Sequence, residues 1–246
     1  MSNHGADLYL DLMKKVLTNT IYADPAIRVW GEDNEEARQE GRDWPSVAHT
    51  MVGMKRLENL QHCVESVLRD NTPGDLIETG VWRGGSSILM RAVLKAHGVL
   101  DRNVWLADSF QGMPVADEQA HPDDQQLQWH LHNDFLAVPL EQVRENFSRY
   151  GLLDQQVRFL PGWFADTLPT IEVDKLAVIR LDGDHYDSTM DALVNLYPRL
   201  SPGGFVIVDD HVLPACSEAV ETYRREHGIT EPLQPIDGVA MFWQRG

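Results

Sequence analysis

The sequence is poor in three features, and each shortage narrows the possible functions. It holds only two cysteines, Cys63 and Cys216, which are far apart and lack a Cys-x-x-Cys partner. A structural zinc site is therefore unexpected, and we predict that both thiols are reduced and buried in a cytoplasmic protein. No apolar run approaches the roughly 18 residues that cross a bilayer. The N-terminus also lacks the charged and apolar regions of a signal peptide, so we expect no membrane partner.

Basic residues are also scarce, with 21 Lys and Arg against 38 Asp and Glu and a formal net charge of −17. Nucleic acids bind proteins chiefly through contacts of Lys and Arg with phosphates. The bases in this chain form no run or patch, so we expect no nucleic-acid partner and favour a small-molecule substrate.

Strand and helix patterns alternate over the second half of the chain. Apolar or β-branched runs predict strands at 75–79, 103–108, 157–160, 176–182 and 204–210, and helical patterns lie at 86–97, 139–150, 186–199 and 214–227. Such alternation predicts a parallel sheet covered by helices on both faces. Asp237-Gly238 between two short extended pieces predicts a C-terminal antiparallel hairpin. The predicted fold is therefore α/β, with a mostly parallel seven-stranded sheet, Rossmann-like and typical of class I S-adenosylmethionine-dependent methyltransferases.

Two regions fall outside this alternation. Helical patterns at 7–23 and 54–70 flank a polar, acidic segment, 24–42, which we expect to form a mobile loop or a short exposed helix. We predict one methyltransferase domain over residues 1–246, with residues 1–72 as an N-terminal helical cap and 73–246 as the core. A long polar segment at about 112–139 is predicted to be a lid insertion over the site.

The glycine-rich turn from Leu76 to Gly85 is the most informative motif. Its pattern is E-x-G-x-x-x-G, at Glu78, Gly80 and Gly84, whereas a dinucleotide site requires G-x-G-x-x-G. An acid here would repel a pyrophosphate but suits a cation, and S-adenosylmethionine carries an ammonium and a sulfonium group. We therefore predict a methyl-donor site that includes Glu78, Thr79 and Gly80. An ordinary strand-to-helix turn with a capping acid remains the alternative.

The ends of the second and third predicted strands add to the donor site, because ligands of open α/β sheets bind beyond the carboxyl ends of the strands. Asp108, followed by Ser109, is placed to accept both ribose hydroxyls of an adenosyl group. After the third strand, Gly162 and Trp163 could press backbone or ring against the adenine. Packing of these aromatic residues in the core explains the pattern equally well.

The fourth and fifth predicted strands end in pairs of acids, Asp182 with Asp184 and Asp209 with Asp210. Four converging carboxylates would repel one another unless a cation were present. Oxygen ligands with open positions favour Mg²⁺, held by Asp182, Asp209 and Asp210, with Asp182 also bordering the donor. If nearby histidines ligate (His185, His211), Mn²⁺ or Zn²⁺ would be possible instead.

The predicted chemistry is attack of a metal-activated hydroxyl on the sulfonium methyl group. Asp184 is the candidate base, because it is expected to lie beside the metal but to point differently from Asp182. Asp182 could both ligate and accept the proton. Histidines of the predicted lid are a third possibility (His121, His130, His132).

Long motifs of this chain resemble the macrocin O-methyltransferase family, whose members methylate sugar hydroxyls on natural products such as macrolides and aminocoumarins. The resemblance rests on 43–45, 48–53, 56–61, 76–85, 107–112, 147–153, 157–163, 181–184, 197–204 and Asp209-Asp210. It implies a class I fold, S-adenosylmethionine, Mg²⁺ and a homodimer or larger homo-oligomer. It also implies that Thr50 and Met51 lie over the methionine end of the donor. The implied acceptor is a sugar hydroxyl on a glycosylated secondary metabolite of the antibiotic type.

The sequence fits three other functions less well. A catechol-type phenol O-methyltransferase would use the same metal, but its base is commonly a lysine near the fourth strand, and Gly183-Asp184-His185 follow Asp182 here. An NAD-dependent oxidoreductase is disfavoured by Glu78 and by the missing third glycine. A non-catalytic binding protein is disfavoured because the acidic cluster is complete.

Overall fold

A mostly parallel sheet forms the centre of the computed structural model, which describes residues 4–27, 35–116, 118 and 120–246. In this part of the chain the sheet has seven strands in the order β5-β4-β3-β6-β7-β9-β8. The strands are β3 (Asp75–Thr79), β4 (Val104–Asp108), β5 (Val157–Pro161), β6 (Leu176–Leu181), β7 (Leu200–Val208), β8 (Gln234–Pro235) and β9 (Met241–Gln244). The first five run parallel, while β9 is antiparallel to both β7 and β8. The predicted sheet and C-terminal hairpin are therefore confirmed.

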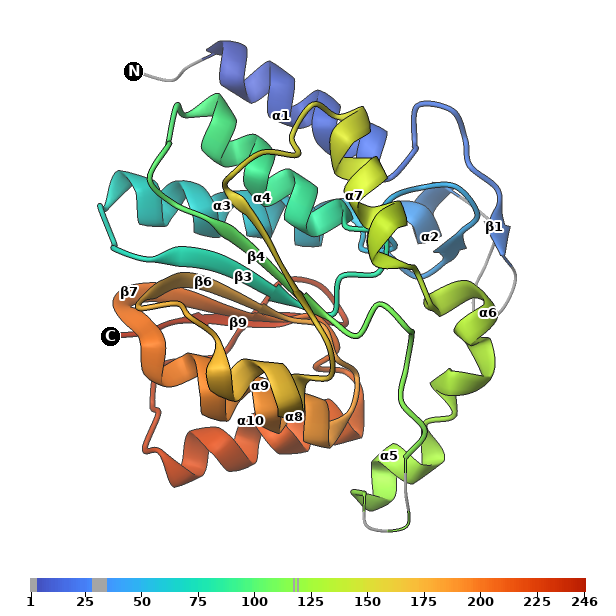
Figure 1. The fold of residues 1–246 in the computed structure, drawn as a ribbon, viewed down its shortest axis with the longest axis vertical. Coiled ribbons are helices and arrows are strands. Elements are labelled where there is room, and N and C mark those ends of the chain that lie inside the picture. The colour runs from blue at the N-terminus through green and yellow to red at the C-terminus, as the bar shows by residue number, and fades with distance from the viewer. Residues whose placement is uncertain (1–3, 28–34, 117, 119) are drawn as a thin grey trace.

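Helices cover both faces of this sheet (Figure 1). One face carries α1 (His4–Leu17), α3 (Met54–Arg69), α4 (Gly85–Ala96) and α7 (Leu140–Arg149), and the other carries α8 (Phe164–Thr167), α9 (Tyr186–Leu196) and α10 (Pro214–Glu226). Short 3-10 turns follow α8 and α9, η2 (Leu168–Thr170) and η3 (Tyr197–Arg199). Side chains alternate along a strand, so Val178 of β6 joins one apolar cluster and Ile179 joins the other. The sheet is thus buried on both faces, as its apolar runs predict.

The N-terminal helix is shorter than its apolar pattern predicts. It ends at Leu17 instead of continuing to residue 23. The Thr18 hydroxyl donates to the Lys14 carbonyl at 2.9 Å, and Asn19 turns the chain with a φ of +52°. Local side-chain bonding of this kind competes with helix continuation. The apolar residues beyond the turn, Ile21 and Tyr22, are exposed.

The acidic segment 24–42 is better packed than predicted. A short helix, α2 (Glu35–Glu40), buries Ala37 and Arg38. The Arg38 guanidinium donates to the Asp43 carboxylate at 2.7 Å and to the Asp24 carbonyl at 3.1 Å. Beside it, β1 (Ala26–Ile27) pairs with β2 (Trp44–Pro45). The expectation of an exposed helix is wrong for α2, because a buried arginine ties it to its neighbours, and residues 28–34 lie outside the described part.

The segment predicted as a lid contains three short helices, α5 (Pro122–Gln126), η1 (Trp129–His132) and α6 (Asn133–Leu136). They lie beyond the carboxyl ends of the strands, at the right of Figure 1. Both cysteines are free and buried, as predicted. In the described residues no helix is long and apolar enough to cross a membrane.

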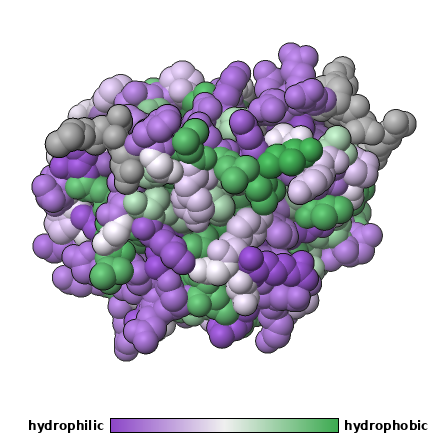
Figure 2. Space-filling model, turned by 90° about the horizontal axis from the view of Figure 1, so that it is seen from above, coloured by the Kyte–Doolittle hydropathy of each residue, from purple (hydrophilic) through white to green (hydrophobic). Residues whose placement is uncertain are grey.

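The surface on the α1 side is mostly hydrophilic, with separate apolar patches (Figure 2). Leu8 and Leu12 of α1 are more than half exposed, at 59% and 53%. Single exposed apolar side chains are common on monomers, so the predicted homo-oligomer stays a prediction.

Candidate active site

Two cavities lie beyond the carboxyl ends of the parallel strands. The first has a volume of about 360 Å³ and extends from the glycine turn to the acids after β6 and β7. The second has a volume of about 270 Å³ and extends toward the turn after β5. They share five lining residues, Gly80, Asp108, Gly112, Met113 and Asp182. The two cavities therefore form one continuous candidate site, hereafter the first and second cavity.

Most of the predicted site residues come together here. The first cavity is lined by Thr50, Met51, Glu78, Gly80, Asp108, Asp182, Asp184, Asp209 and Asp210, and the second adds Ser109 and Trp163. Thr79 and Gly162 are not among the described residues that line either cavity. The Thr79 hydroxyl donates to the Arg180 carbonyl at 3.4 Å, and the Gly162 amide donates to the Asp108 carbonyl at 2.9 Å. These two residues thus shape the backbone around the site.

The glycine turn is packed so closely that a side chain does not fit at Gly80. Its φ is +86°, a region that side chains disfavour, and a Cβ atom there would overlap the carbonyl oxygen of Asp182. A Cβ atom on Gly85, the first residue of α4, would likewise overlap the His49 carbonyl. The turn therefore contacts Asp182, at the end of β6, and also the His49–Thr50 segment. The second contact explains how Thr50 and Met51 reach the site.

Asp108 fastens the same turn. Its carboxylate accepts from the Val81 amide at 2.6 Å and from the Phe110 amide at 2.6 Å. Burial raises the pKa of Asp108 above its ordinary value, and these backbone donors oppose that rise. The predicted contact with ribose is an additional role for oxygens that already hold the turn, and it stays a prediction.

A buried arginine that sequence reasoning missed lies beneath the acids. The Arg180 guanidinium in β6 donates to Glu78 at 2.7 Å, to Asp182 at 2.5 Å and to Asp209 at 2.5 Å. Arg56 of α3 donates to the other oxygen of Asp209 at 2.7 Å. The positive charge that the converging acids require is therefore supplied partly by arginines. A signal was present in the sequence, because Arg180 is the one charged residue in the otherwise apolar run 176–181.

The arginines affect the carboxylates unequally. Burial raises the pKa of Glu78 to about 7 despite its bond to Arg180 and a hydrogen bond from the Ser87 hydroxyl. For Asp209, burial also acts to raise the pKa, but Arg180 and Arg56 together hold it below its ordinary value. Asp209 is therefore the carboxylate of this group whose negative charge is best compensated by protein cations.

Asp182, Asp209 and Asp210 each place one carboxylate oxygen within 4.8 Å of the other two. The Oδ2 atom of Asp210 is buried and has no hydrogen-bond partner among the described residues. Burial raises the pKa of Asp210 well above its ordinary value, and the negative charges of Asp184, Asp182 and Asp209 raise it further. An orphaned buried oxygen beside two further oxygens fits a hard divalent cation such as Mg²⁺. Neither His185 nor His211 belongs to this cluster of Asp182, Asp209 and Asp210.

Asp184 lines the first cavity from an unusual backbone position, with a φ of +57°. Burial, together with Asp182 and Asp209, raises its pKa to about 8. A carboxylate with a raised pKa accepts a proton more readily once it is ionised, which suits a general base. The lid histidines that were weighed as bases, His121, His130 and His132, are not among the described lining residues.

Aromatic side chains form one wall of the first cavity. Trp44, Trp82 and Trp129 line it, and Trp44 lies 6.1 Å from Trp129 between ring centroids. The Phe135 ring stacks on Trp44 with centroids 5.2 Å apart. These residues are not among the site residues predicted from the sequence: Trp44 and Trp82 lie within the motifs that carry the family resemblance, and Trp129 lies in the polar lid segment. Their rings offer apolar faces with a few polar edges beside the acids.

Known proteins match this chain over nearly its full length. The family model described as macrocin-O-methyltransferase (TylF) matches residues 25–245. A Streptomyces olivaceus protein named 8-demethyl-8-(2,3-dimethoxy-alpha-L-rhamnosyl)-tetracenomycin-C 4'-O-methyltransferase is 64% identical, covering 99% of this chain and 95% of its own. The mycinamicin III 3''-O-methyltransferase of Micromonospora griseorubida is 56% identical, covering 98% and 97%. The solved structure of the O-methyltransferase NovP superposes with a TM-score of 0.95 at 57% identity, covering 98% and 99%.

Proposed function

The chain belongs to the macrocin-O-methyltransferase (TylF) family, and from that membership we propose that it methylates a sugar hydroxyl on a glycosylated natural product of the antibiotic type. It is an S-adenosylmethionine-dependent O-methyltransferase, so the predicted fold and enzyme class are confirmed. Two relatives support a glycosylated acceptor, because their names specify a rhamnosyl tetracenomycin and mycinamicin III.

The donor fits across both cavities. We assign the adenosyl end to the second cavity, between Ser109 and Trp163, and the methionine end to the first cavity beside Gly80 and the Thr50–Met51 segment. Asp108 borders both cavities, which is where the ribose between the two ends would lie. This orientation places the transferable methyl group toward Asp182 and Asp184.

The metal site is proposed to take Mg²⁺ through Asp182, Asp209 and Asp210, supported by the unpartnered buried Oδ2 atom of Asp210. When bound, Mg²⁺ would supply Lewis-acid chemistry that lowers the pKa of a hydroxyl in the site. Arg180 and Arg56 each donate to one oxygen of the Asp209 carboxylate. The protein therefore orients the ligands before a cation binds.

Asp184 is the proposed general base. It accepts the proton of the acceptor hydroxyl, and the oxygen forms a bond to the methyl carbon as the carbon–sulfur bond breaks, leaving S-adenosylhomocysteine. Asp182 is the alternative base, but its carboxylate is already bonded to Arg180. The raised pKa of Asp184 and its place in the first cavity support the assignment.

The observation that carries the proposal is that the acids, the glycine turn and the wall of Trp44, Trp82 and Trp129 meet in the first cavity. Indole faces pack well against the apolar faces of sugar rings, while the acids orient a hydroxyl. The homo-oligomer, the cytoplasmic location and the division into helical cap, core and lid remain predictions.

The test has two parts. In the first, S-adenosylhomocysteine is titrated calorimetrically into protein with Mg²⁺, and we expect micromolar binding. In the second, transfer of a labelled methyl group is measured for a rhamnosylated aromatic polyketide, its aglycone and a catechol, with Mg²⁺ or with EDTA. We expect transfer only to the glycoside and only with the metal. Equal turnover of the catechol would favour the phenol methyltransferase instead, and absence of donor binding would overturn the proposal.

A further inference from the structure

Helix α9 begins directly after the loop that carries Asp182 and Asp184. Within the part of the chain that the structure describes, its N-cap residue, His185, makes no side-chain capping bond. The first amides of a helix have no partner within the helix, so they need acceptors from elsewhere. The start of α9 is therefore a point where another part of the chain can control this loop.

The acceptor comes from the lid segment. Asp124 of α5 accepts from the Tyr186 amide at 2.7 Å and from the Asp187 amide at 3.2 Å. Its side chain is almost fully buried, with 2% exposure. A carboxylate at this position both accepts from amides at the start of the helix and complements the positive end of the helix dipole. Asp124 thus caps α9 although it lies 62 residues earlier in the chain.

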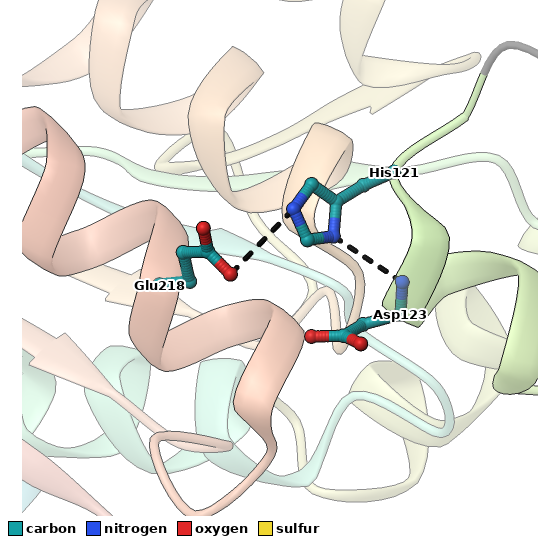
Figure 3. A group of neighbouring side chains, drawn as sticks. All are labelled: His121, Asp123 and Glu218. Atoms are coloured by element: carbon teal, nitrogen blue, oxygen red, sulfur yellow. Dashed lines mark hydrogen bonds and ion pairs between the residues drawn. The ribbon is translucent and has the colours of Figure 1, made fainter.

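His121 strengthens the same attachment (Figure 3). Its ring stacks on Tyr186 with centroids 4.2 Å apart, and its Nε2 atom lies 3.6 Å from the Glu218 carboxylate of α10. Its Nδ1 atom accepts from the Asp123 amide at 3.3 Å, so the proton of the neutral ring sits on Nε2 and faces Glu218. The Nδ1 atom is engaged within α5 and the Nε2 atom faces Glu218, so we interpret His121 and Glu218 as a clasp between α5 and α10 rather than as a metal site. Asp123 contributes only its backbone amide to this contact.

Docking of the lid also completes the second cavity. Lid residues form one wall, namely Met113, Pro114, Val115, Ala116, Ala120 and Asp124, and Trp163, Phe164 and Gly183 lie among the remaining lining residues. Asp184, two positions before Tyr186, holds a left-handed backbone conformation that persists only when its surroundings enforce it. The lid segment that caps α9 therefore also forms this wall of the second cavity.

We propose that Asp124 is a positioning residue, which caps α9 when the lid segment docks and thereby holds the Asp182–His185 loop in the geometry for methyl transfer. The proposal rests on the proposed function, since it assigns the catalytic acids to that loop. It makes the docked lid and the competent loop a single state of the enzyme.

The test compares Asp124→Ala and Asp124→Asn with Asp123→Asn, a charge change at the neighbouring position. Hydrogen exchange of the Tyr186 and Asp187 amides is followed in all three, together with kcat and KM. In Asp124→Ala we expect roughly tenfold faster exchange of these amides and a fall in kcat of about the same size, as loss of a helix cap predicts. The KM for S-adenosylmethionine should rise more than the KM for the glycoside, because Asp124 lines the second cavity and not the first.

Asp124→Asn should recover most of both effects, because asparagine caps helices about as well as aspartate. Asp123→Asn should resemble the wild type. Unchanged exchange in Asp124→Ala would show that the cap is not formed, and faster exchange with an unchanged kcat would show that the cap does not position the loop. Either result overturns the proposal. Wild-type transfer to the glycoside is measured first, so a failure of the proposed function is seen separately, and the amide exchange still decides whether the lid caps α9.

Discussion

Replacing Arg180 with methionine removes a guanidinium that contacts two buried carboxylates and one half-buried carboxylate at once. Glu78, Asp182 and Asp209 each accept a bond from it, and methionine fills similar volume without charge. Glu78 and Asp209 have side chains only 2% and 5% exposed, so water cannot replace the lost partner. We therefore expect a large loss of stability rather than the small effect of a surface charge change.

The expected size follows from the cost of breaking a buried ion pair, about 3–5 kcal/mol. For a chain of this length each kcal/mol lowers the melting temperature by about 2–4 °C, so the midpoint should fall by roughly 6–20 °C. Arg180 and Arg56 hold the folded pKa of Asp209 below its value of 3.8 in the unfolded chain. Their stabilisation is thus fully present above pH 3.8 and is lost as the pH falls through the lower folded pKa.

Urea unfolding at pH 7, followed by circular dichroism, measures the loss directly. Arg69→Met is the control, since Arg69 is 64% exposed and, among the residues that the structure describes, pairs with its neighbour Asp70 alone. Its removal should change stability by at most about 0.5 kcal/mol. Saturating Mg²⁺ should stabilise Arg180→Met more than the wild type, because a cation among the acids replaces part of the missing charge. A loss below about 1 kcal/mol in Arg180→Met would refute the assignment of Arg180 as the central compensating charge.

Three further substitutions separate the parts of the site. Gly80→Ala should lower stability by about 1–3 kcal/mol more than Gly98→Ala, because both have positive φ but only Gly80 faces a backbone carbonyl; equal losses in urea unfolding would contradict this. Asp184→Asn should lower kcat by about 10²–10⁴-fold with unchanged S-adenosylhomocysteine binding. In the wild type the folded pKa of Asp184 is about 8, above its value of 3.8 in the unfolded chain, so its stabilisation is present below pH 3.8 and lost as the pH approaches 8. In EDTA, the stability of Asp184→Asn should therefore fall less than that of the wild type as the pH rises. Asp210→Asn should weaken calorimetric Mg²⁺ binding at least about tenfold, and unchanged affinity would argue against Asp210 as a ligand.

The sequence predicts the sheet and most of the site because the relevant rules are local. Apolar runs separated by helical patterns identify the strands, and the glycine turn at Gly80 is visible from its spacing alone. Strand boundaries agree within about two residues except for β7, which begins at Leu200 rather than at 204. Pro202 and Gly203 obscure its start, where the pairing with β6 is irregular. Because parallel strands end at one edge, the acids after β6 and β7 could be placed together without coordinates.

The interactions that only the tertiary structure decided join residues far apart along the chain. Arg180 reaches Glu78, 102 positions away, because β3 and β6 are neighbours in the sheet although β4 and β5 lie between them in the sequence. Arg56 reaches Asp209 across 153 positions, and Asp124 reaches the start of α9 from the lid. Local periodicity states which face of an element is apolar, but it carries no information on which distant polar group will lie opposite. The predicted chemistry thus came from residue types at strand ends, whereas the charge compensation and the capping of its loop came from long-range packing.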